Sequence, residues 1–556
     1  MSRTSHQATA LRVFAEALSE CGVRDAILSP GSRSAPLILA LARTEGLTPH
    51  SVIDERSAGF FALGTAKASG YPAVVACTSG TAAAELAPAV HEAREARTPL
   101  LVITADRPAE LRAAGDNQTI DQVGVFGSAA ETVTAPKFEG TTLEDWEAFA
   151  RELVDATLRP FPSPVHVNMQ LWDPLAAESE SIQASGQKAL SPFEAHHLAP
   201  VNLPGGRTVV IAGRDEFGFD ADLSAAAEAA ALPVLADPLS PVAQAPSANV
   251  IENWDSLLRV NEWAERHRPD VILRTGDLPT SKALREWISA SAAAGTEVLH
   301  FDPLDSRRDP SSVNTARFTS TVAPSINAGP RGDHLWLEAW QGADAVAAAA
   351  LRSGASAHQA LSEPQIAAAI TSALSNHDLL FVAASMPVRD LESFGLLKDG
   401  PRVFANRGAN GIDGTIASAA GLASASGQPT VLLLGDVTFA HDVASLATLR
   451  TVNTPFLGVV INNGGGAIFD GLAISGAGQT YEDFVFTPPQ LNIRAACEAW
   501  GVEYSLGTTL GDLESALESL GSLNAPKVLD LTIDRATSPA HRAELRAAVS
   551  AALLSS

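Results

Sequence analysis

The chain has 556 residues, of which 46% are hydrophobic and 18% charged, so it has enough apolar material for several buried cores and is not compositionally disordered. Its formal net charge of -25 argues against nucleic acid and anionic membranes as partners, because both would repel the chain. At roughly 150 residues a domain, this length predicts three or four domains.

The N-terminal stretch, residues 1–22, predicts an amphipathic helix and lacks the continuous apolar core of a signal peptide. No apolar run further along is long enough to span a membrane. Cys21, Cys77 and Cys497 lie far apart in apolar stretches, which indicates buried thiols and not metal ligands or disulfides. We therefore expect a cytoplasmic protein without membrane contacts.

Short β-branched runs alternate with alanine-rich helical stretches along most of the chain. These runs are PAVVAC, PLLVIT, RTVVIAG, LPVLAD, DVILRTG, TVLLLGD and FLGVVIN. Continuous apolar strands between helices predict parallel sheets covered by helices on both faces, so the expected fold class is α/β.

Two stretches interrupt this alternation. Residues 174–206 are rich in Ser, Pro and Gly, and residues from about 325 to 362 are weakly patterned. They divide the chain into three predicted α/β domains, 1–180, 200–330 and 360–556.

The first and third domains resemble each other in sequence order. From Pro72 and again from Pro429, a strand is followed by a glycine-containing turn, an alanine-rich helix, the dipeptide Thr-Pro and a second strand. We predict a duplicated domain with a different domain between the copies. Two unrelated βαβ units are the alternative, since this unit is common.

Polar side chains end two strands of the third domain. Asp436 ends TVLLLGD, and Asn463 follows FLGVVIN and precedes three glycines, Gly464 to Gly466. The carboxyl ends of parallel strands share the edge where ligands bind, so these oxygens, with a glycine carbonyl, suit Mg2+ and a phosphate group. The helix after Asp436 would present N–H groups to the same phosphates. Taken alone, such residues are also common in turns.

The order Gly-Asp, an intervening βα stretch and Asn-Asn resembles the diphosphate-binding motif of thiamine-diphosphate enzymes, apart from Val437, where many members have glycine. The resemblance implies thiamine diphosphate and Mg2+ as cofactors, with the metal held by Asp436, Asn463 and Gly465. It also implies that Glu55, at a predicted strand-to-helix junction, activates the cofactor's aminopyrimidine. A helix-terminal glutamate paired with Arg56 is the alternative.

The same resemblance assigns further cofactor contacts in the third domain. The glycines of NRGANGIDGTI allow close approach, and Ile412 would be the apolar wedge that bends the cofactor. The remaining implied contacts are Ser385, Gly411, Val437, Ile468 and Phe469. For Ile468 and Phe469, plain core packing is an equal alternative.

Several motifs narrow the resemblance to one subfamily. SPGSRSAPL, DERSAGFFALG, TSGTAAAEL, ITADRPAEL, GDNQTIDQ and NRGANGIDGTI are similar to the 2-succinyl-5-enolpyruvyl-6-hydroxy-3-cyclohexene-1-carboxylate (SEPHCHC) synthase family of menaquinone biosynthesis, and LPTSKAL extends a weaker match into the central domain. The resemblance implies a transferase that decarboxylates 2-oxoglutarate and adds the resulting carbanion to isochorismate by 1,4-addition. It further implies a homodimer or homotetramer with active sites between subunits.

Both implied substrates are dicarboxylates and need several cations. The four candidate arginines are expected in loops at strand ends, where guanidinium groups bind carboxylates bidentately, although any one alone would be expected on the solvated surface. They are Arg33, Arg107, Arg389 and Arg407. The other implied substrate contacts are Ser32, Asn117, Gln118, Lys282 and Ser385.

Two further groups are not expected to act in the site. His196-His197 resembles the proton-donating pair of simple thiamine decarboxylases but falls in the Ser/Pro-rich stretch. Arg97, with Arg307 and Arg308, could form an anionic effector pocket, but solvated surface is the favoured interpretation.

Three alternatives are less favoured. An acetolactate-synthase-like enzyme would need an apolar donor pocket and often a flavin. A catalytically idle regulatory homologue would be expected to lack Glu55 or Asp436, both of which are present. A Rossmann dehydrogenase would need a G-x-G-x-x-G motif, which the chain lacks.

Overall fold

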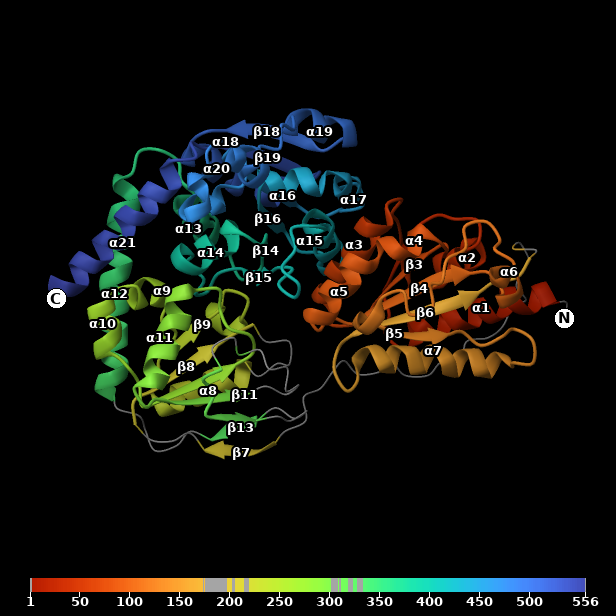
Figure 1. Ribbon diagram of the computed structural model, residues 1–556, viewed down its shortest axis with the longest axis horizontal. Coiled ribbons are helices and arrows are strands. Elements are labelled where there is room, and N and C mark those ends of the chain that lie inside the picture. The colour runs from red at the N-terminus through yellow and green to blue at the C-terminus, as the bar shows by residue number, and fades with distance from the viewer. Residues whose placement is uncertain are drawn as a thin grey trace.

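The computed structural model describes residues 3–173, 175, 198–202, 206–214, 220–301, 309, 312–318, 324–327 and 334–555. It contains three parallel sheets and a small two-stranded sheet (Figure 1). Helices cover both faces of each large sheet, because successive strand residues point alternately into different apolar clusters. The predicted α/β class is confirmed.

The first large sheet has the strand order β2-β1-β3-β4-β6-β5. Its strands are β1 (Asp25–Leu28), β2 (Thr48–Ser51), β3 (Ala73–Cys77), β4 (Leu100–Asp106), β5 (Glu131–Thr134) and β6 (Pro164–Gln170). One face is covered by α1 (Arg3–Glu20), α2 (Ala35–Arg43) and α7 (Leu143–Leu158), and the other by α3 (Glu55–Ser69) and α5 (Ala87–Glu95). Two short helices, α4 (Thr81–Glu85) and α6 (Ala109–Ala113), follow strand ends.

The third large sheet repeats this layout, with the order β15-β14-β16-β17-β19-β18. Its strands are β14 (Leu379–Val382), β15 (Arg402–Phe404), β16 (Thr430–Gly435), β17 (Phe456–Asn462), β18 (Glu503–Gly507) and β19 (Lys527–Thr532). Helices α13 (Glu363–Ala373), α14 (Met386–Phe394) and α20 (Leu510–Glu518) pack on one face. Helices α15 (Thr415–Ser426), α16 (Asp436–His441), α17 (Leu446–Leu449) and α19 (Ile493–Trp500) pack on the other. The predicted likeness of the first and third domains is confirmed.

The central sheet differs, with the order β12-β11-β10-β8-β9. Its strands are β8 (Thr208–Ala212), β9 (Val234–Ala236), β10 (Val271–Thr275), β11 (Glu297–Phe301) and β12 (Ala316–Phe318). Helix α8 (Asp220–Ala230) covers one face, and α9 (Trp254–Leu258), α10 (Asn261–Arg266), α11 (Lys282–Ala293) and α12 (His334–Ala357) cover the other. The C-terminal helix α21 (Thr537–Ser555) packs along α12.

The two predicted interruptions are partly wrong. The first contains β7 (Leu198–Asn202), which pairs with β13 (Pro324–Asn327). The second is mostly α12, a helix of 24 residues. Alanine favours helix, and Trp336 and Trp340 bury one side of α12 against the central domain, so weak patterning did not prevent folding. His196 and His197 lie outside the described residues.

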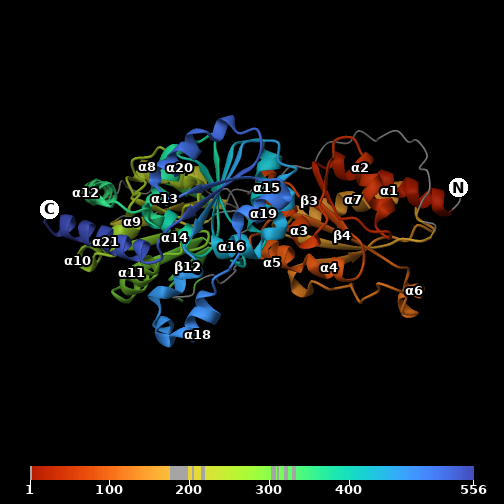
Figure 2. The same ribbon diagram turned by 90° about the horizontal axis from the view of Figure 1, so that it is seen from above.

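The first and third domains meet where α3 lies against α15, as both ribbon views show (Figures 1 and 2). The two backbones are unusually close. A Cβ added to Gly64 would lie 1.9 Å from the carbonyl oxygen of Ser418, and one added to Gly421 would lie 2.0 Å from that of Phe61. Only glycine permits this approach between the helices.

The three cysteines are buried free thiols, as predicted. Among the helices that the structure describes, none has the length and apolar character needed to cross a membrane.

Candidate active site

A pocket of about 150 Å3 opens at the carboxyl ends of β14 and β16. Here the order in which the chain adds strands to the third sheet reverses, since β15 lies on one side of β14 and β16 on the other. Ligands of open parallel sheets bind at such a switch point. Of the residues predicted to bind cofactor or metal, this pocket contains Ser385, Ile412, Asp436, Val437, Asn463, Gly465, Ile468 and Phe469.

Asp436 is only 3% exposed. Its carboxylate accepts hydrogen bonds from the backbone N–H groups of Val437 at 2.7 Å and Gly464 at 2.8 Å. Burial raises the pKa of Asp436 to about 6, and these backbone hydrogen bonds act in the opposite direction. No Lys, Arg or His pairs with Asp436 in the described part of the chain, so a buried carboxylate faces the pocket without a counter-cation. That arrangement fits a bound metal ion.

Asn463 and Gly465 add oxygens beside this carboxylate. Asn463 Nδ2 donates to Glu363 Oε1 at 2.9 Å, and its Oδ1 accepts a long contact from Gly465 N at 3.4 Å. Gly465 has φ +157°, and a Cβ there would lie 2.7 Å from Phe486. Within the described ranges, no group of three or more His, Cys, Asp or Glu side chains is placed to hold a metal. One carboxylate with amide and carbonyl oxygens therefore suits Mg2+, which keeps waters and ligand phosphates in its shell.

Apolar side chains line the pocket beside these oxygens. Ile412 and Ile468 are half-buried. Phe469 is 38% exposed, so the alternative that it is an ordinary core residue is wrong. Gly411 does not line the pocket itself but precedes Ile412. The backbone of this loop is fixed by Glu92, which accepts from Gly408 N at 2.7 Å and Ala409 N at 2.6 Å.

The sequence interpretation missed Glu363, the first residue of α13, which lines the pocket. Burial raises the pKa of Glu363 to about 7; the charge of Asp390 acts in the same direction, and Arg542 opposes both. Residues 362–365 signal a helix start, because Ser362 and Gln365 form a capping box. Nothing in the sequence indicates that this helix end meets Asn463.

Two of the predicted substrate arginines, Arg389 and Arg407, belong to the third domain. Arg407 is largely desolvated, which lowers its pKa, while Asp237 acts in the opposite direction. Arg389 is close enough to Arg407 to repel it. The expectation of a loop is wrong for Arg389, which lies inside α14 and donates to Ser385 O at 2.5 Å. Pro387 in the first helical turn and the apolar residues Val388 and Leu391 explain why this stretch is helical.

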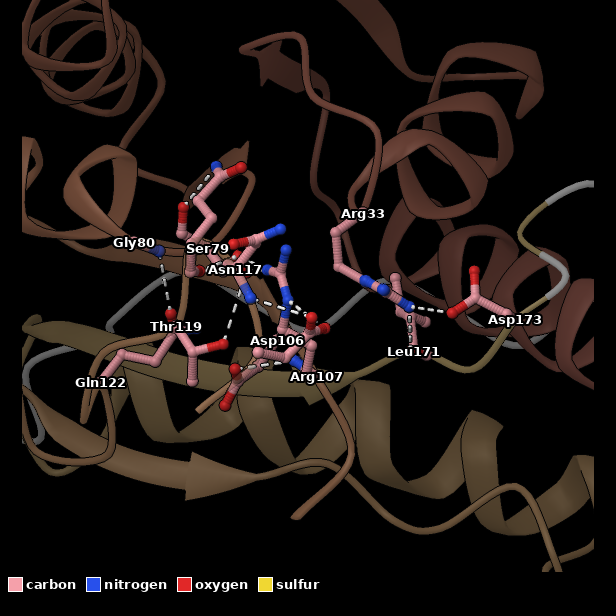
Figure 3. A network of polar contacts seen from close by, with 12 residues as sticks. Arg33, Ser79, Gly80, Asp106, Arg107, Asn117, Thr119, Gln122, Leu171 and Asp173 are labelled. Atoms are coloured by element: carbon pink, nitrogen blue, oxygen red, sulfur yellow. Dashed lines mark hydrogen bonds and ion pairs between the residues drawn. The ribbon is translucent and has the colours of Figure 1, made fainter. Parts of the chain in front are cut away.

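The other two arginines belong to a polar network in the first domain (Figure 3). Arg33 donates to Leu171 O and Asp173 Oδ2, each at 3.0 Å. Arg107 donates to Asp116 at 3.3 Å and to Gln118 O at 3.1 Å.

The neutral members of the first-domain set lie around the same turns. The Gln118 side chain donates to Ser79 O at 2.9 Å, with its backbone at φ +57°. Ser32 and Asn117 are exposed.

Glu55 begins α3, directly after β2, so its predicted strand-to-helix junction is confirmed. Partial burial raises its pKa, and the charges of Asp54 and Glu85 add to this effect. The alternative pairing with Arg56 is wrong, because Arg56 faces the third domain. It lies 3.6 Å from Asp442 and donates to His441 O at 3.3 Å.

One chain does not gather all the predicted residues. Glu55 does not line the pocket, and the first-domain network near α6 is far from α14 and α16 (Figure 1). Lys282 is 81% exposed, pairs with Glu286 at 3.4 Å, and borders a separate pocket of about 520 Å3. Arg97 is only 7% exposed, so the expectation that it lies on the solvated surface is wrong. Arg307 and Arg308 lie outside the described residues.

Three protein-family models match the chain. They are described as the N-terminal TPP binding domain of thiamine pyrophosphate enzymes (residues 8–125), the middle domain of thiamine pyrophosphate enzymes (residues 185–382) and their C-terminal TPP binding domain (residues 393–531). Thiamine pyrophosphate is another name for thiamine diphosphate.

Curated relatives match over nearly their whole length, and the following three carry the name 2-succinyl-5-enolpyruvyl-6-hydroxy-3-cyclohexene-1-carboxylate synthase. The protein of Synechococcus elongatus is 35% identical, over 97% of this chain and 95% of the relative. That of Myxococcus xanthus is 36% identical, over 94% of each. That of Listeria monocytogenes is 32% identical, over 98% and 97%.

Proposed function

Because the chain belongs to the SEPHCHC synthase family of thiamine pyrophosphate enzymes, we propose that it is a transferase of menaquinone biosynthesis that decarboxylates 2-oxoglutarate and joins the remaining fragment to isochorismate by 1,4-addition. The observation that carries this proposal is the buried carboxylate of Asp436, which has no cationic partner among the described residues, at the switch point of the third sheet. A bound Mg2+ would supply the missing positive charge, and the oxygens of the cofactor diphosphate would complete its ligand shell.

The side chains divide into three tasks in this proposal. Asp436, Asn463 and the carbonyl of Gly465 hold Mg2+, and Ser385, Gly411 and Val437 lie along the cofactor. Ile412, Ile468 and Phe469 form the apolar wall that excludes water from the reacting atoms. Bound thiamine diphosphate supplies the electron sink that lets a 2-oxo acid lose carbon dioxide.

Glu55 and the cationic residues act on cofactor and substrates. We assign Glu55 to hold a proton at the aminopyrimidine, a task helped by its raised pKa. Arg389 and Arg407 bind substrate carboxylate on the third-domain side. The first-domain contacts of the substrates are Ser32, Arg33, Arg107, Asn117 and Gln118, and Lys282 is assigned to the substrate only by its motif.

We further propose that each site forms between two chains, in a homodimer or homotetramer. The first-domain set lies far from the pocket of its own chain, which a second copy would correct. Exposed apolar side chains support a protein interface on both sides. Ile53, beside Glu55, is 80% exposed, and Phe484 is 78% exposed just after α18 (Gln479–Tyr481), in a segment that projects from the body in Figure 2.

Domain bounds and location complete the proposal. The bounds 1–180, 200–330 and 360–556 each enclose one large sheet, although the middle family model extends to residue 382. A cytoplasmic location is supported by three free, buried thiols, which persist in reducing compartments.

The direct test incubates the purified protein with thiamine diphosphate, Mg2+, 2-oxoglutarate and isochorismate and follows the adduct by mass spectrometry. We expect an adduct that requires all four components. A parallel assay replaces 2-oxoglutarate with pyruvate, which lacks the second carboxylate and would lose about 1–3 kcal/mol of interaction with the arginines. A kcat/KM for pyruvate equal to or above that for 2-oxoglutarate would favour an acetolactate-synthase-like activity instead.

A further inference from the structure

A buried ion-pair cluster lies directly behind the predicted metal site, and the proposed reaction assigns it no role. Glu363 comes from the start of α13, Asp390 from α14 and Arg542 from α21. Their side chains are 4%, 4% and 11% exposed. Arg542 donates from Nε to Asp390 Oδ1 at 2.7 Å and from Nη2 to Asp390 Oδ2 at 2.6 Å, and Nη2 also contacts Glu363 Oε2.

The second oxygen of Glu363 reaches the metal site through Asn463. Glu363 Oε1 accepts from Asn463 Nδ2 at 2.9 Å, while Oε2 is held by Arg542. Both carboxylate oxygens are therefore engaged by protein groups, so Glu363 is not arranged as a metal ligand. The amide nitrogen and oxygen of Asn463 leave the same carbon in different directions. Holding Nδ2 on Glu363 therefore turns Oδ1 toward Gly465, whose backbone nitrogen lies 3.4 Å from Oδ1.

Arg542 also reaches the other wall of the pocket. Its partner Asp390 lies in α14, and that helix begins with Met386 and Pro387, which line the pocket next to Ser385. A single side chain of the C-terminal helix thus holds two elements that border the same pocket. Buried ion pairs are weak evidence for net stability, since well-packed apolar residues often replace them without loss. Stability alone does not explain three charges at this place.

We infer that Glu363 and Arg542 are positioning residues that orient the amide of Asn463 toward the metal and so set the affinity for Mg2+ and the cofactor diphosphate. The inference rests on the proposed function and adds two residues to its metal site. Groups that hydrogen-bond a metal ligand from behind typically change metal affinity 10- to 100-fold when they are altered.

The test measures thiamine diphosphate binding by calorimetry at a series of Mg2+ concentrations, with the full-length apoprotein. We expect Glu363→Gln to raise the half-saturating Mg2+ concentration about tenfold or more, because an amide has an oxygen on only one side and leaves either Asn463 Nδ2 or Arg542 facing an NH2 group. Asp309→Asn is the matched control. It also neutralises a buried carboxylate paired with an arginine, Arg274 at 3.3 Å, but in the central domain, and its half-saturating concentration should stay within about twofold of wild type.

A double mutant separates positioning from general loosening. If Glu363 acts through Asn463, then adding Glu363→Gln to an Asn463→Ala background should change the Mg2+ requirement by less than about twofold. An equal effect in both backgrounds, or a single variant within twofold of wild type, would overturn the inference.

A second variant covers the case in which Glu363→Gln fails to fold by circular dichroism. Arg542→Lys keeps the positive charge but lacks the guanidinium group that contacts Asp390 and Glu363 together, so it should raise the half-saturating Mg2+ concentration at least about threefold. A value within twofold of wild type would overturn the inference. Wild-type protein without Mg2+-dependent binding would instead refute the proposed function itself.

Discussion

Replacing Gly64 with alanine tests how the first and third domains are joined. Gly64 lies within α3, where its new Cβ would be 1.9 Å from the backbone oxygen and 2.9 Å from the Cα of Ser418 in α15. Real Cβ atoms essentially never come within 3.0 Å of a nonbonded atom of another segment, so α3 and α15 must separate by about 1 Å. Backbone atoms cannot rotate aside as a flexible side chain does.

Two opposing effects give this substitution a definite sign. Alanine in a helix interior is favoured over glycine by about 1 kcal/mol. Overpacking costs about 1–3 kcal/mol, and separation also weakens the hydrogen bond from Ser418 Oγ to Phe60 O at 3.1 Å. We therefore expect Gly64→Ala to destabilise the protein despite its better helix propensity.

The assay is urea unfolding followed by circular dichroism, read as an apparent midpoint because a chain of several domains need not unfold in one step. Gly342→Ala is the control, since Gly342 lies within α12 and nothing would touch its new Cβ within 4 Å. That variant should gain up to about 1 kcal/mol. A Gly64→Ala midpoint equal to or above that of wild type would refute the close-contact argument.

Three further predictions concern the site and the pH dependence of stability. Asp436→Ala should abolish tight, Mg2+-dependent binding of thiamine diphosphate while circular dichroism stays unchanged, because the variant lacks the only carboxylate proposed to hold the metal; calorimetry showing wild-type affinity would place the metal elsewhere. Mixing Glu55→Gln with Asp436→Ala by joint unfolding and refolding should restore roughly a quarter of the sites, since random pairing makes about half the dimers mixed and each mixed dimer rebuilds one intact site. Activity that stays at the level of the separate variants would mean that both residues act within one chain. Burial lowers the pKa of His166 from 6.5 to about 4, so the unfolded chain binds more protons between these values, and stability falls as pH drops through that window. Between pH 7 and pH 5, protonation of His166 in the unfolded chain should lower the free energy of unfolding of the wild type by about 2 kcal/mol. Urea titrations at both pH values should show that His166→Gln lacks this decrease.

The sequence by itself determined the α/β class and one edge of the site. Each predicted apolar run became a strand, because continuous β-branched segments can bury both faces only inside a covered parallel sheet. Asp436 and Asn463 were expected together for the same reason, since β16 and β17 are neighbours and carry their final residues to one edge. The duplicated order of motifs likewise predicted two sheets of one layout.

Only the tertiary structure decided which distant groups support that edge. Glu363 and Arg542 are separated by most of the third domain, and no local pattern links a helix start to the C-terminal helix that pairs with it. The long helix α12 was not predicted for a related reason. Its alanine-rich sequence has weak hydrophobic periodicity, and Trp336 and Trp340 pack it against another part of the chain. Periodicity indicates the local structure of a segment, whereas ion pairs such as Glu363–Arg542 form only when packing brings together residues far apart in sequence.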